Sequence, residues 1–309
     1  MRVAFLGTPE VAVPALDALV AAGDVEVAVV LTNPDRPKGR SRTPVAPPVK
    51  QAALAHGLEV WQPAKPSEVL DEFAALQVDA CAVVAYGALL PKRFLEAGGR
   101  GFVNLHFSLL PRWRGAAPVQ HALRAGDERT GITTFVLDEG MDTGPILDRV
   151  VVPIDPDESA GDLLARLARL GAPVLVDSIR RLVAGEEPVA QPAEGATLAP
   201  KITPDDVRID WRAPARAVVD LVRSADPAPG AHTTWRGRRL KVLATRATDT
   251  TGEPGTVVAR TGEGVEVAAG DGAVLLRRVQ PEGKAAMDGV AFANGYRPEP
   301  GERLGEYAS

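Results

Sequence analysis

The sequence predicts a two-part α/β protein: a Rossmann-like domain with a mostly parallel sheet, followed by a small β-barrel of the OB-like kind. Apolar, strand-like runs alternate with helical patterns through the first half of the chain, which is typical of a parallel sheet covered by helices. A stretch rich in Pro, Ala and Glu follows, and short strands separated by Gly-rich turns then fill the last hundred residues. The length of 309 residues fits about two domains. We place the boundaries at 1–187 for the first domain, 188–206 for a linker and 207–309 for the barrel.

The first domain is expected to alternate strands and helices in chain order. Its strands are predicted at 2–7, 25–32, 79–87, 101–106 and 130–138. Its helices are predicted at 8–23, 47–57, 66–77 and 117–126, and one long or two short helices at 159–185 close the domain. Thr8 is a candidate N-cap for the first helix. Ligands of such sheets bind outside the carboxyl ends of the strands, so those ends are where a site is expected.

The second domain is expected to begin with a short helix at 213–225. Five strands should follow it, at 231–237, 238–247, 255–261, 264–270 and 273–281. Five short strands suit an OB-like barrel, a fold that often presents one face to nucleic acid.

Composition and charge restrict the class of protein. Cys81 is the only cysteine and lies in an apolar run, so a disulfide framework is excluded and a reducing, cytoplasmic location is expected. The N-terminus begins in a strand-like run with no signal-peptide pattern, and no apolar run is long enough to span a membrane. The net charge of −5 argues against a general polyanion binder, yet residues 207–309 carry 15 Lys and Arg against 13 Asp and Glu.

Two polar residues, Asn104 and His106, interrupt the apolar run FVNLH at 102–106. Side chains two residues apart on a strand point the same way, so both should face the crevice at the strand end while Leu105 faces away. A core histidine with a satisfied hydrogen bond is the alternative. The neighbouring amide, and a loop of turn-forming residues from Ser108 to Pro111, favour a functional site.

A third candidate, Asp142, lies in the segment DEGMDTGPIL at 138–147. An ordinary Asp-Gly turn is the alternative explanation. An amide, an imidazole and a carboxylate together suit acyl transfer to an amine. Asn104 and a protonated His106 can donate hydrogen bonds to the oxyanion that forms, and Asp142 can move a proton and favour the imidazolium.

Three other chemistries fit the residues less well. Ser108 as a nucleophile lacks the G-x-S-x-G elbow and is only two residues from His106 along the chain. No His or Cys residues are paired at metal-ligand spacing, so no metal site is expected. The early GTPE at 7–10 is not a G-x-G-x-x-G fingerprint, so a dinucleotide is not predicted.

Taken together, the N-x-H pair, the run SLLPRWRGAAP at 108–118 and DEGMDTGPIL resemble the methionyl-tRNA formyltransferase family. PDRPKGR at 34–40 and RIDW at 208–211 extend the resemblance over nearly the whole chain. It implies transfer of the formyl group of 10-formyltetrahydrofolate to the amino group of methionine on initiator tRNA, for the initiation of translation. The first domain is then a formyltransferase domain.

The resemblance also assigns residues to roles. It implies a catalytic trio of Asn104, His106 and Asp142. It implies a folate-binding segment formed by Ser108, Leu109, Leu110 and Pro111, next to a pterin-pocket segment at 86–91. Phe107 stands where many relatives have a small residue, and Ala228 where relatives often have an aromatic one, so contacts from these two positions are in question.

Two basic stretches are candidate RNA contacts. The segment 36–50 holds five basic residues and no acidic one, and it is long for a strand-to-helix connection. The resemblance implies acceptor-arm contacts from its residues Arg36, Lys38, Arg40 and Arg42. The stretch 236–246 in the barrel is also basic, and the run Arg112–Arg114 lies where an acceptor end would approach. Solvated loops and ordinary strand charge are the alternatives.

Two other functions share some of these features. A formyltransferase acting on a small amine, such as a nucleotide sugar or glycinamide ribonucleotide, would keep the trio but would not need the basic loop. A non-enzymatic RNA-binding protein would not need the intact trio. The favoured partner is initiator methionyl-tRNA, with no membrane and no obligate protein partner.

Overall fold

The computed structural model describes residues 1–37 and 43–305. Two compact units divide the chain, and neither is continuous in sequence. The first unit comprises 1–115, 129–153 and 164–199, and the second comprises 116–128, 154–163 and 200–309. The first unit contains the carboxyl ends of the parallel strands, where a site was expected.

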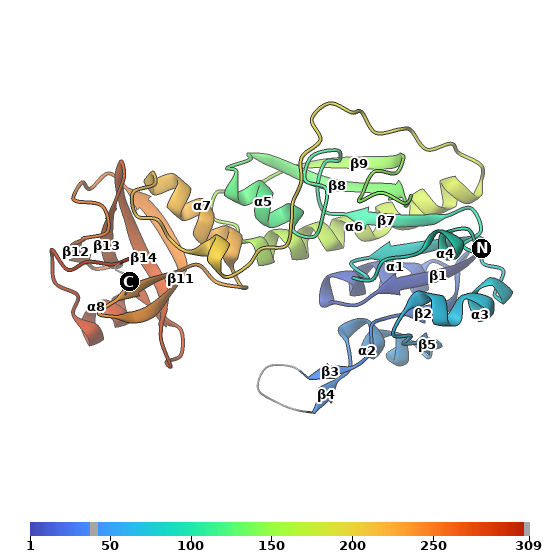
Figure 1. The fold of residues 1–309 in the computed structure, drawn as a ribbon, viewed down its shortest axis with the longest axis horizontal. Coiled ribbons are helices and arrows are strands. Elements are labelled where there is room, and N and C mark those ends of the chain that lie inside the picture. Colours follow the sequence, from blue (N-terminus) through green and yellow to red (C-terminus); the bar gives the residue numbers. More distant parts are fainter. Residues whose placement is uncertain (38–42, 306–309) are drawn as a thin grey trace. The chain divides into compact units, whose positions relative to one another are not determined.

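The first unit is built on a seven-stranded sheet in the order β5-β2-β1-β6-β7-β8-β9 (Figure 1). The five strands from β5 to β7 are parallel, and β8 and β9 are antiparallel additions at one edge. Their bounds are β1 Arg2–Gly7, β2 Glu26–Leu31, β5 Val60–Trp61, β6 Ala80–Val84, β7 Phe102–His106, β8 Arg129–Val136 and β9 Ile146–Pro153. The predicted Rossmann-like, mostly parallel sheet is confirmed. The edge strand β9 was not predicted, because its alternating exposed residues give only a weak apolar signal.

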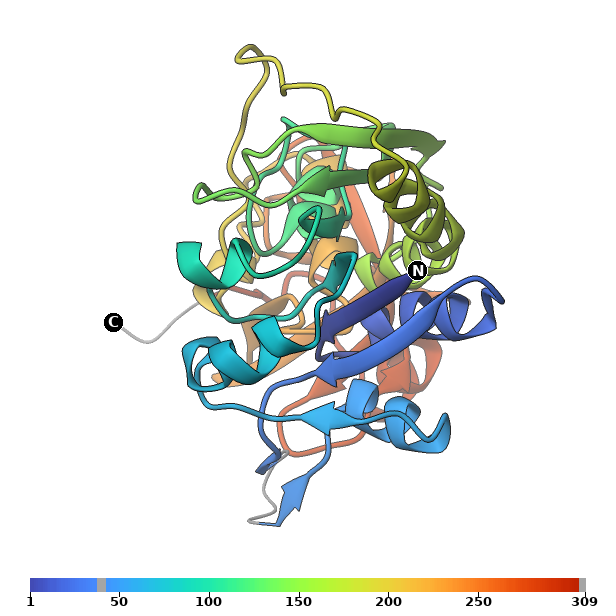
Figure 2. The same ribbon diagram turned by 90° about the vertical axis from the view of Figure 1, so that its right-hand side faces the viewer.

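Helices cover both faces of this sheet. In Figure 2, α1 and α6 lie to one side of the sheet and α3 and α4 to the other. The helices of this part of the chain are η1 Glu10–Ala12, α1 Val13–Ala21, α2 Pro48–Ala55, η2 Pro66–Val69, α3 Leu70–Ala75, α4 Lys92–Leu95 and the single long α6 Ala160–Val183. Phe73 of α3 stacks on Phe94 of α4 and on Phe102 of β7, and the Phe94 and Phe102 rings contact each other in a tilted arrangement. A short hairpin of β3 Arg36–Pro37 and β4 Pro44–Val45 precedes α2.

The sequence suggested Thr8 as the N-cap of the first helix, but Thr8 does not cap it. The helix α1 begins after Ala12, with no side-chain cap. The Thr8 hydroxyl instead donates a hydrogen bond to the Tyr86 carbonyl, at 2.9 Å. Thr8 therefore connects the loops that follow β1 and β6, where the parallel strands end.

The second unit contains an antiparallel sheet in the order β10-β11-β14-β13-β12, with β15 paired to β14. These strands are β10 His232–Trp235, β11 Arg238–Thr248, β12 Val257–Thr261, β13 Gly264–Ala269, β14 Gly272–Pro281 and β15 Met287–Asp288. The helices are α5 Pro118–Arg124, η3 Asp205–Val207, α7 Ala215–Ala225 and α8 Gly289–Tyr296. All five predicted strands are present, and β15 and α8 were not predicted.

The C-terminal segment closes this sheet. Leu304 bridges Trp235 of β10, and Arg303 bridges Thr256 beside β12. Because β10 and β12 are the two ends of the strand order, a segment bridged to both joins the sheet edges, as in a barrel. The barrel encloses an apolar core that includes Trp211, Val267 and Phe292.

Candidate active site

Asn104 and His106 lie at the carboxyl end of β7, the last parallel strand of the sheet. Leu105 points to the opposite face, where its side chain packs on Gly171 of α6. Asn104 is half-buried, whereas His106 is 6% exposed. The strand alternation predicted from the sequence therefore holds, and the amide and the imidazole share one face.

The His106 ring is held by hydrogen bonding on one side and by a carboxylate on the other. Its Nε2 lies 2.9 Å from the Trp113 carbonyl oxygen, and its Nδ1 lies 3.7 Å from Oδ2 of Asp142. A carbonyl oxygen only accepts hydrogen bonds, so Nε2 carries the proton of the neutral ring and Nδ1 carries the lone pair. The lone pair consequently faces Asp142.

Burial lowers the pKa of His106, and the Asp142 carboxylate and the Trp113 carbonyl oppose this effect. Since burial is the largest cause, the surroundings of the ring favour its neutral form. A hydrogen bond from a protonated His106 to the oxyanion stays a prediction. The burial that opposes the charged ring comes from other segments of the chain, so the sequence does not display it.

The Asp142 side chain is fixed by the backbone of a neighbouring loop. Its Oδ2 accepts a hydrogen bond from the Gly115 amide, at 2.7 Å. The backbone is unusual around this site, because Ala85, Trp113 and Asp142 all have positive φ angles, of 46°, 64° and 53°. Residues held in this left-handed region cost free energy and cluster at functional sites.

A pocket of about 430 Å³ opens beside these residues. Asn104 and Asp142 line it together with two loops, 85–90 after β6 and 137–142 after β8. Leu89 and Met141 in these loops are 87% and 67% exposed. Apolar side chains left open at the mouth of a pocket favour a ligand with an apolar or aromatic surface.

The segment from Ser108 to Pro111 does not line this pocket. Ser108, Leu110 and Pro111 are buried, and Leu109 packs against Gly131 of β8. The Ser108 hydroxyl donates to the Arg112 carbonyl at 2.6 Å, and the Thr133 hydroxyl donates to the Ser108 carbonyl at 2.7 Å. The described geometry thus makes 108–111 a tightly bonded turn, and it gives no support to Ser108 as a nucleophile.

Two residues of the extended segment after α6 also hold the site, and the sequence did not point to them. Nε2 of the Gln191 side chain donates hydrogen bonds to the backbone carbonyls of Asp142 and Gly144, at 2.9 and 2.8 Å. The Thr197 hydroxyl accepts from the Trp113 amide, at 2.8 Å. Because Trp113 in turn binds His106, this segment positions both the imidazole and the carboxylate. No local pattern could reveal this, since the partners are 49 and 84 residues apart.

The predicted RNA-contact residues are described only in part. Arg36 is exposed in β3, whereas Lys38, Arg40 and Arg42 lie outside the described residues. In the run 112–114, Arg112 stacks on the Trp113 ring and Arg114 donates to the Gln191 side chain. In the barrel stretch, Arg238 and Arg239 are exposed.

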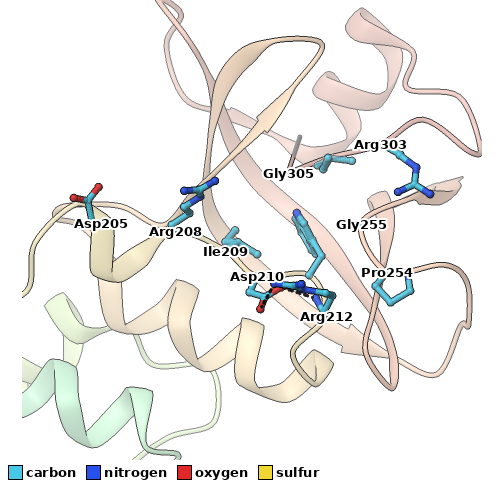
Figure 3. A pocket seen from close by; sticks show the side chains of 11 residues that line it. Asp205, Arg208, Ile209, Asp210, Arg212, Pro254, Gly255, Arg303 and Gly305 are labelled. Carbon is cyan, nitrogen blue, oxygen red and sulfur yellow. Dashed lines mark hydrogen bonds and ion pairs between the residues drawn. The ribbon is translucent and has the colours of Figure 1, made fainter. Parts of the chain in front are cut away.

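Another pocket, of about 690 Å³, lies in the second unit, where the C-terminal segment closes the sheet (Figure 3). Arg208, Arg212 and Arg303 line it. Asp210 binds Arg212, and Glu253 binds Arg303, so carboxylates already neutralise these two cations. This pocket contains none of the site residues described above.

Residues 1–37 and 43–305 contain no group of three His, Cys, Asp or Glu side chains placed to hold a metal ion. Over the same ranges, no helix combines the length and the apolar character needed to cross a membrane.

Comparison with known proteins agrees with the class of site described here. A family model described as "Formyl transferase" matches residues 1–179, and one described as "Formyl transferase, C-terminal domain" matches residues 201–297. The fold and the site thus define a formyltransferase.

Curated relatives narrow the class. A methionyl-tRNA formyltransferase of Streptomyces coelicolor is 51% identical over 99% of this chain and 100% of its own length. A second, from Streptomyces griseus, is also 51% identical over the same shares. Among solved structures, WlaRD, a sugar 3N-formyl transferase, has a TM-score of 0.68 at 16% identity over 92% of this chain and 99% of its own, which shows a shared fold. The chain belongs to the methionyl-tRNA formyltransferase family, and the predicted enzyme class is confirmed.

Proposed function

We propose that this chain transfers the formyl group of 10-formyltetrahydrofolate to the amino group of methionyl initiator tRNA, in the cytoplasm, for the initiation of translation. The observation that carries the proposal is the convergence of Asn104, His106 and Asp142 at the end of β7, beside a pocket with an apolar mouth. Full-length identity of about half to methionyl-tRNA formyltransferases supports tRNA as the acceptor rather than a small amine.

The formyl donor fits the pocket of about 430 Å³. The flat, partly apolar ring system of a folate suits the loops 85–90 and 137–142, whose leucines and Met141 line the pocket. Asn104 and Asp142 then lie where the formyl carbon would be presented. Folate binding by the segment of Ser108, Leu109, Leu110 and Pro111 stays a prediction. The hydrogen bond from the Ser108 hydroxyl to the Arg112 carbonyl supports another role, which is to shape the turn that leads to Trp113.

The proposed chemistry follows from the protonation state of His106. The methionyl amine attacks the formyl carbon, a new C–N bond forms, and the carbonyl oxygen becomes an oxyanion. The Asn104 amide donates a hydrogen bond to this oxyanion. Nδ1 of neutral His106 accepts the surplus proton of the amine, and the Asp142 carboxylate stabilises the imidazolium. The proton then passes to N10 of the folate as the bond between N10 and the formyl carbon breaks.

The acceptor RNA is proposed to contact the basic residues Arg36, Lys38, Arg40 and Arg42, together with the exposed arginines Arg238 and Arg239 of the barrel. Arginine side chains suit phosphate groups because they present several donors in a planar fork. Their contribution should depend on salt concentration, as expected for contacts to a polyanion.

A panel of acceptors tests the proposal. We would measure formyl transfer from 10-formyltetrahydrofolate to methionyl initiator tRNA, to the same tRNA uncharged, to a nucleotide amino sugar and to glycinamide ribonucleotide. The proposal expects rapid formylation of the methionyl-tRNA alone. Faster transfer to either small amine would overturn it.

A further inference from the structure

A second pocket of the first unit lies at the carboxyl ends of β1 and β2, and its volume is about 490 Å³. Its wall is mostly apolar. The apolar residues that line it are Pro9, Pro34, Pro37, Val45, Ala46, Pro47 and Pro48. The polar residues Thr8, Asn33 and Gln51 line its remaining wall together with two exposed charged residues, Glu10 and Arg36. The trio of the active site does not line this pocket.

One turn separates this pocket from the proposed donor pocket. Tyr86 lines the donor pocket, and its carbonyl accepts hydrogen bonds from the Thr8 hydroxyl at 2.9 Å and from the Asn33 side chain at 2.8 Å. Thr8 and Asn33 line the second pocket. The Thr8 hydroxyl also accepts from the Asn33 amide, at 3.3 Å, so the shared wall is internally bonded. The two pockets are therefore neighbours with a fixed partition.

The chemistry of this wall selects for an apolar group. Proline rings and the Val45 side chain offer no hydrogen-bond donors, and Val45 is 42% exposed although it is apolar. A polar group buried against this part of the wall would lose its hydrogen bonds to water and gain no donor in return. An unbranched, flexible thioether can fill such an irregular space, as methionine does in protein cores.

We propose that this pocket holds the methionine side chain of the acceptor, an inference that rests on the proposed function. The reacting amine and the methionine side chain are attached to the same carbon atom. When the amine reaches the formyl group near Asn104 and Asp142, the side chain must therefore lie in an adjoining space. The ribose and adenine are farther along the ester, so the apolar pocket next to the partition suits the side chain better than the base.

Filling the pocket tests this assignment. Ala46→Phe places a ring in the pocket, and Ala55→Phe is the matched control, because Ala55 is exposed on α2 and does not line the pocket. Each variant is assayed on one initiator tRNA charged with methionine or with alanine. Because the ring would occupy the space proposed for the methionine side chain, Ala46→Phe should lower kcat/KM for the methionyl form by about 10- to 100-fold. The alanyl form should change by less than about threefold, as should both forms in the control.

A second pair of variants tests the assignment without adding a large ring that could disturb folding. Val45→Asn adds a polar group to the exposed part of the wall, and Leu54→Asn, at a residue that is 58% exposed on α2, is its control. Val45→Asn should weaken the preference for methionyl over alanyl acceptor, while tetrahydrofolate affinity stays unchanged in every variant. Equal losses of kcat/KM on the methionyl and alanyl acceptors would place the adenosine in this pocket instead of the methionine side chain. An unchanged preference for the methionyl acceptor in both pocket variants would also overturn the assignment. Failure of the unaltered chain to formylate methionyl-tRNA would instead reject the proposed function.

Discussion

Nδ1 of His106 lies 3.7 Å from the Asp142 carboxylate, inside a site where the imidazole is almost fully buried. Burial favours the neutral ring, whereas the carboxylate favours the charged one. This balance suits a group that must accept a proton during the reaction and release it again. Asp142 is therefore proposed to control how easily His106 is protonated, in addition to holding its position.

Replacing Asp142 should change both the rate and its pH dependence. Asp142→Asn keeps the shape but removes the charge that raises the pKa of His106, so that pKa should fall further. The step that needs neutral His106 should then proceed at lower pH, so the acid limb of the pH profile of kcat should shift to lower pH. The rate itself should fall about 100-fold or more, since the imidazolium loses its partner. Rate profiles from pH 5 to 8 measure both effects, and an acid limb that moves upward would contradict this role.

Gln191 is expected to act by positioning Asp142. Gln191→Ala removes two hydrogen bonds to the loop 142–144, so kcat should fall about tenfold while tetrahydrofolate affinity changes little. If Gln191 acts through the Asp142 carboxylate, Gln191→Ala should lower kcat far less in the Asp142→Asn background than in the parent chain. A double-mutant cycle measures this coupling. Independent losses in the two backgrounds would show that Gln191 only stabilises the fold.

Ser108 should be dispensable for chemistry. Its hydroxyl is wholly buried and donates to the Arg112 carbonyl, so Ser108→Ala should cost roughly 1 kcal/mol of unfolding free energy. Activity should stay within about tenfold of the parent, because the turn would be loosened by one hydrogen bond. Denaturant unfolding and steady-state kinetics test both parts. A formylated Ser108 trapped during turnover would establish the rival nucleophilic mechanism.

The basic side chains within the segment 36–50 should act on the RNA and not on the donor. Arg40→Ala is expected to raise KM for methionyl-tRNA, or lower kcat on it, by about tenfold to a hundredfold, with unchanged donor affinity. The effect should shrink at high salt, because screening already weakens such a contact in the parent protein. Arg129→Ala, at an exposed arginine of β8, controls for loss of a positive charge. Equal tRNA kinetics for Arg40→Ala and the control would leave Arg40 a solvated loop residue.

Sequence patterns predicted the sheet and its polar strand end because both depend on local periodicity. The alternation in 102–106 fixed which face Asn104 and His106 share, and the positions after parallel strands indicated where a crevice would form. The protonation state of His106 could not be predicted, since it depends on burial by distant segments. The roles of Gln191 and Thr197 in holding the site were equally hidden, because a residue in an extended, proline-rich segment shows no sign of its distant partners.

The central claim is that the side chains at the end of β7 carry out formyl transfer to methionyl-tRNA. The most direct measurement is the single-turnover rate of formyl-methionyl-tRNA formation with both substrates saturating, for the parent chain, His106→Ala and Asn104→Ala. We expect folded variants that bind tetrahydrofolate normally and react on the order of 10²- to 10³-fold more slowly, since each loses a group that acts on the reacting atoms. A rate near that of the parent in either variant would show that these side chains do not carry out the reaction.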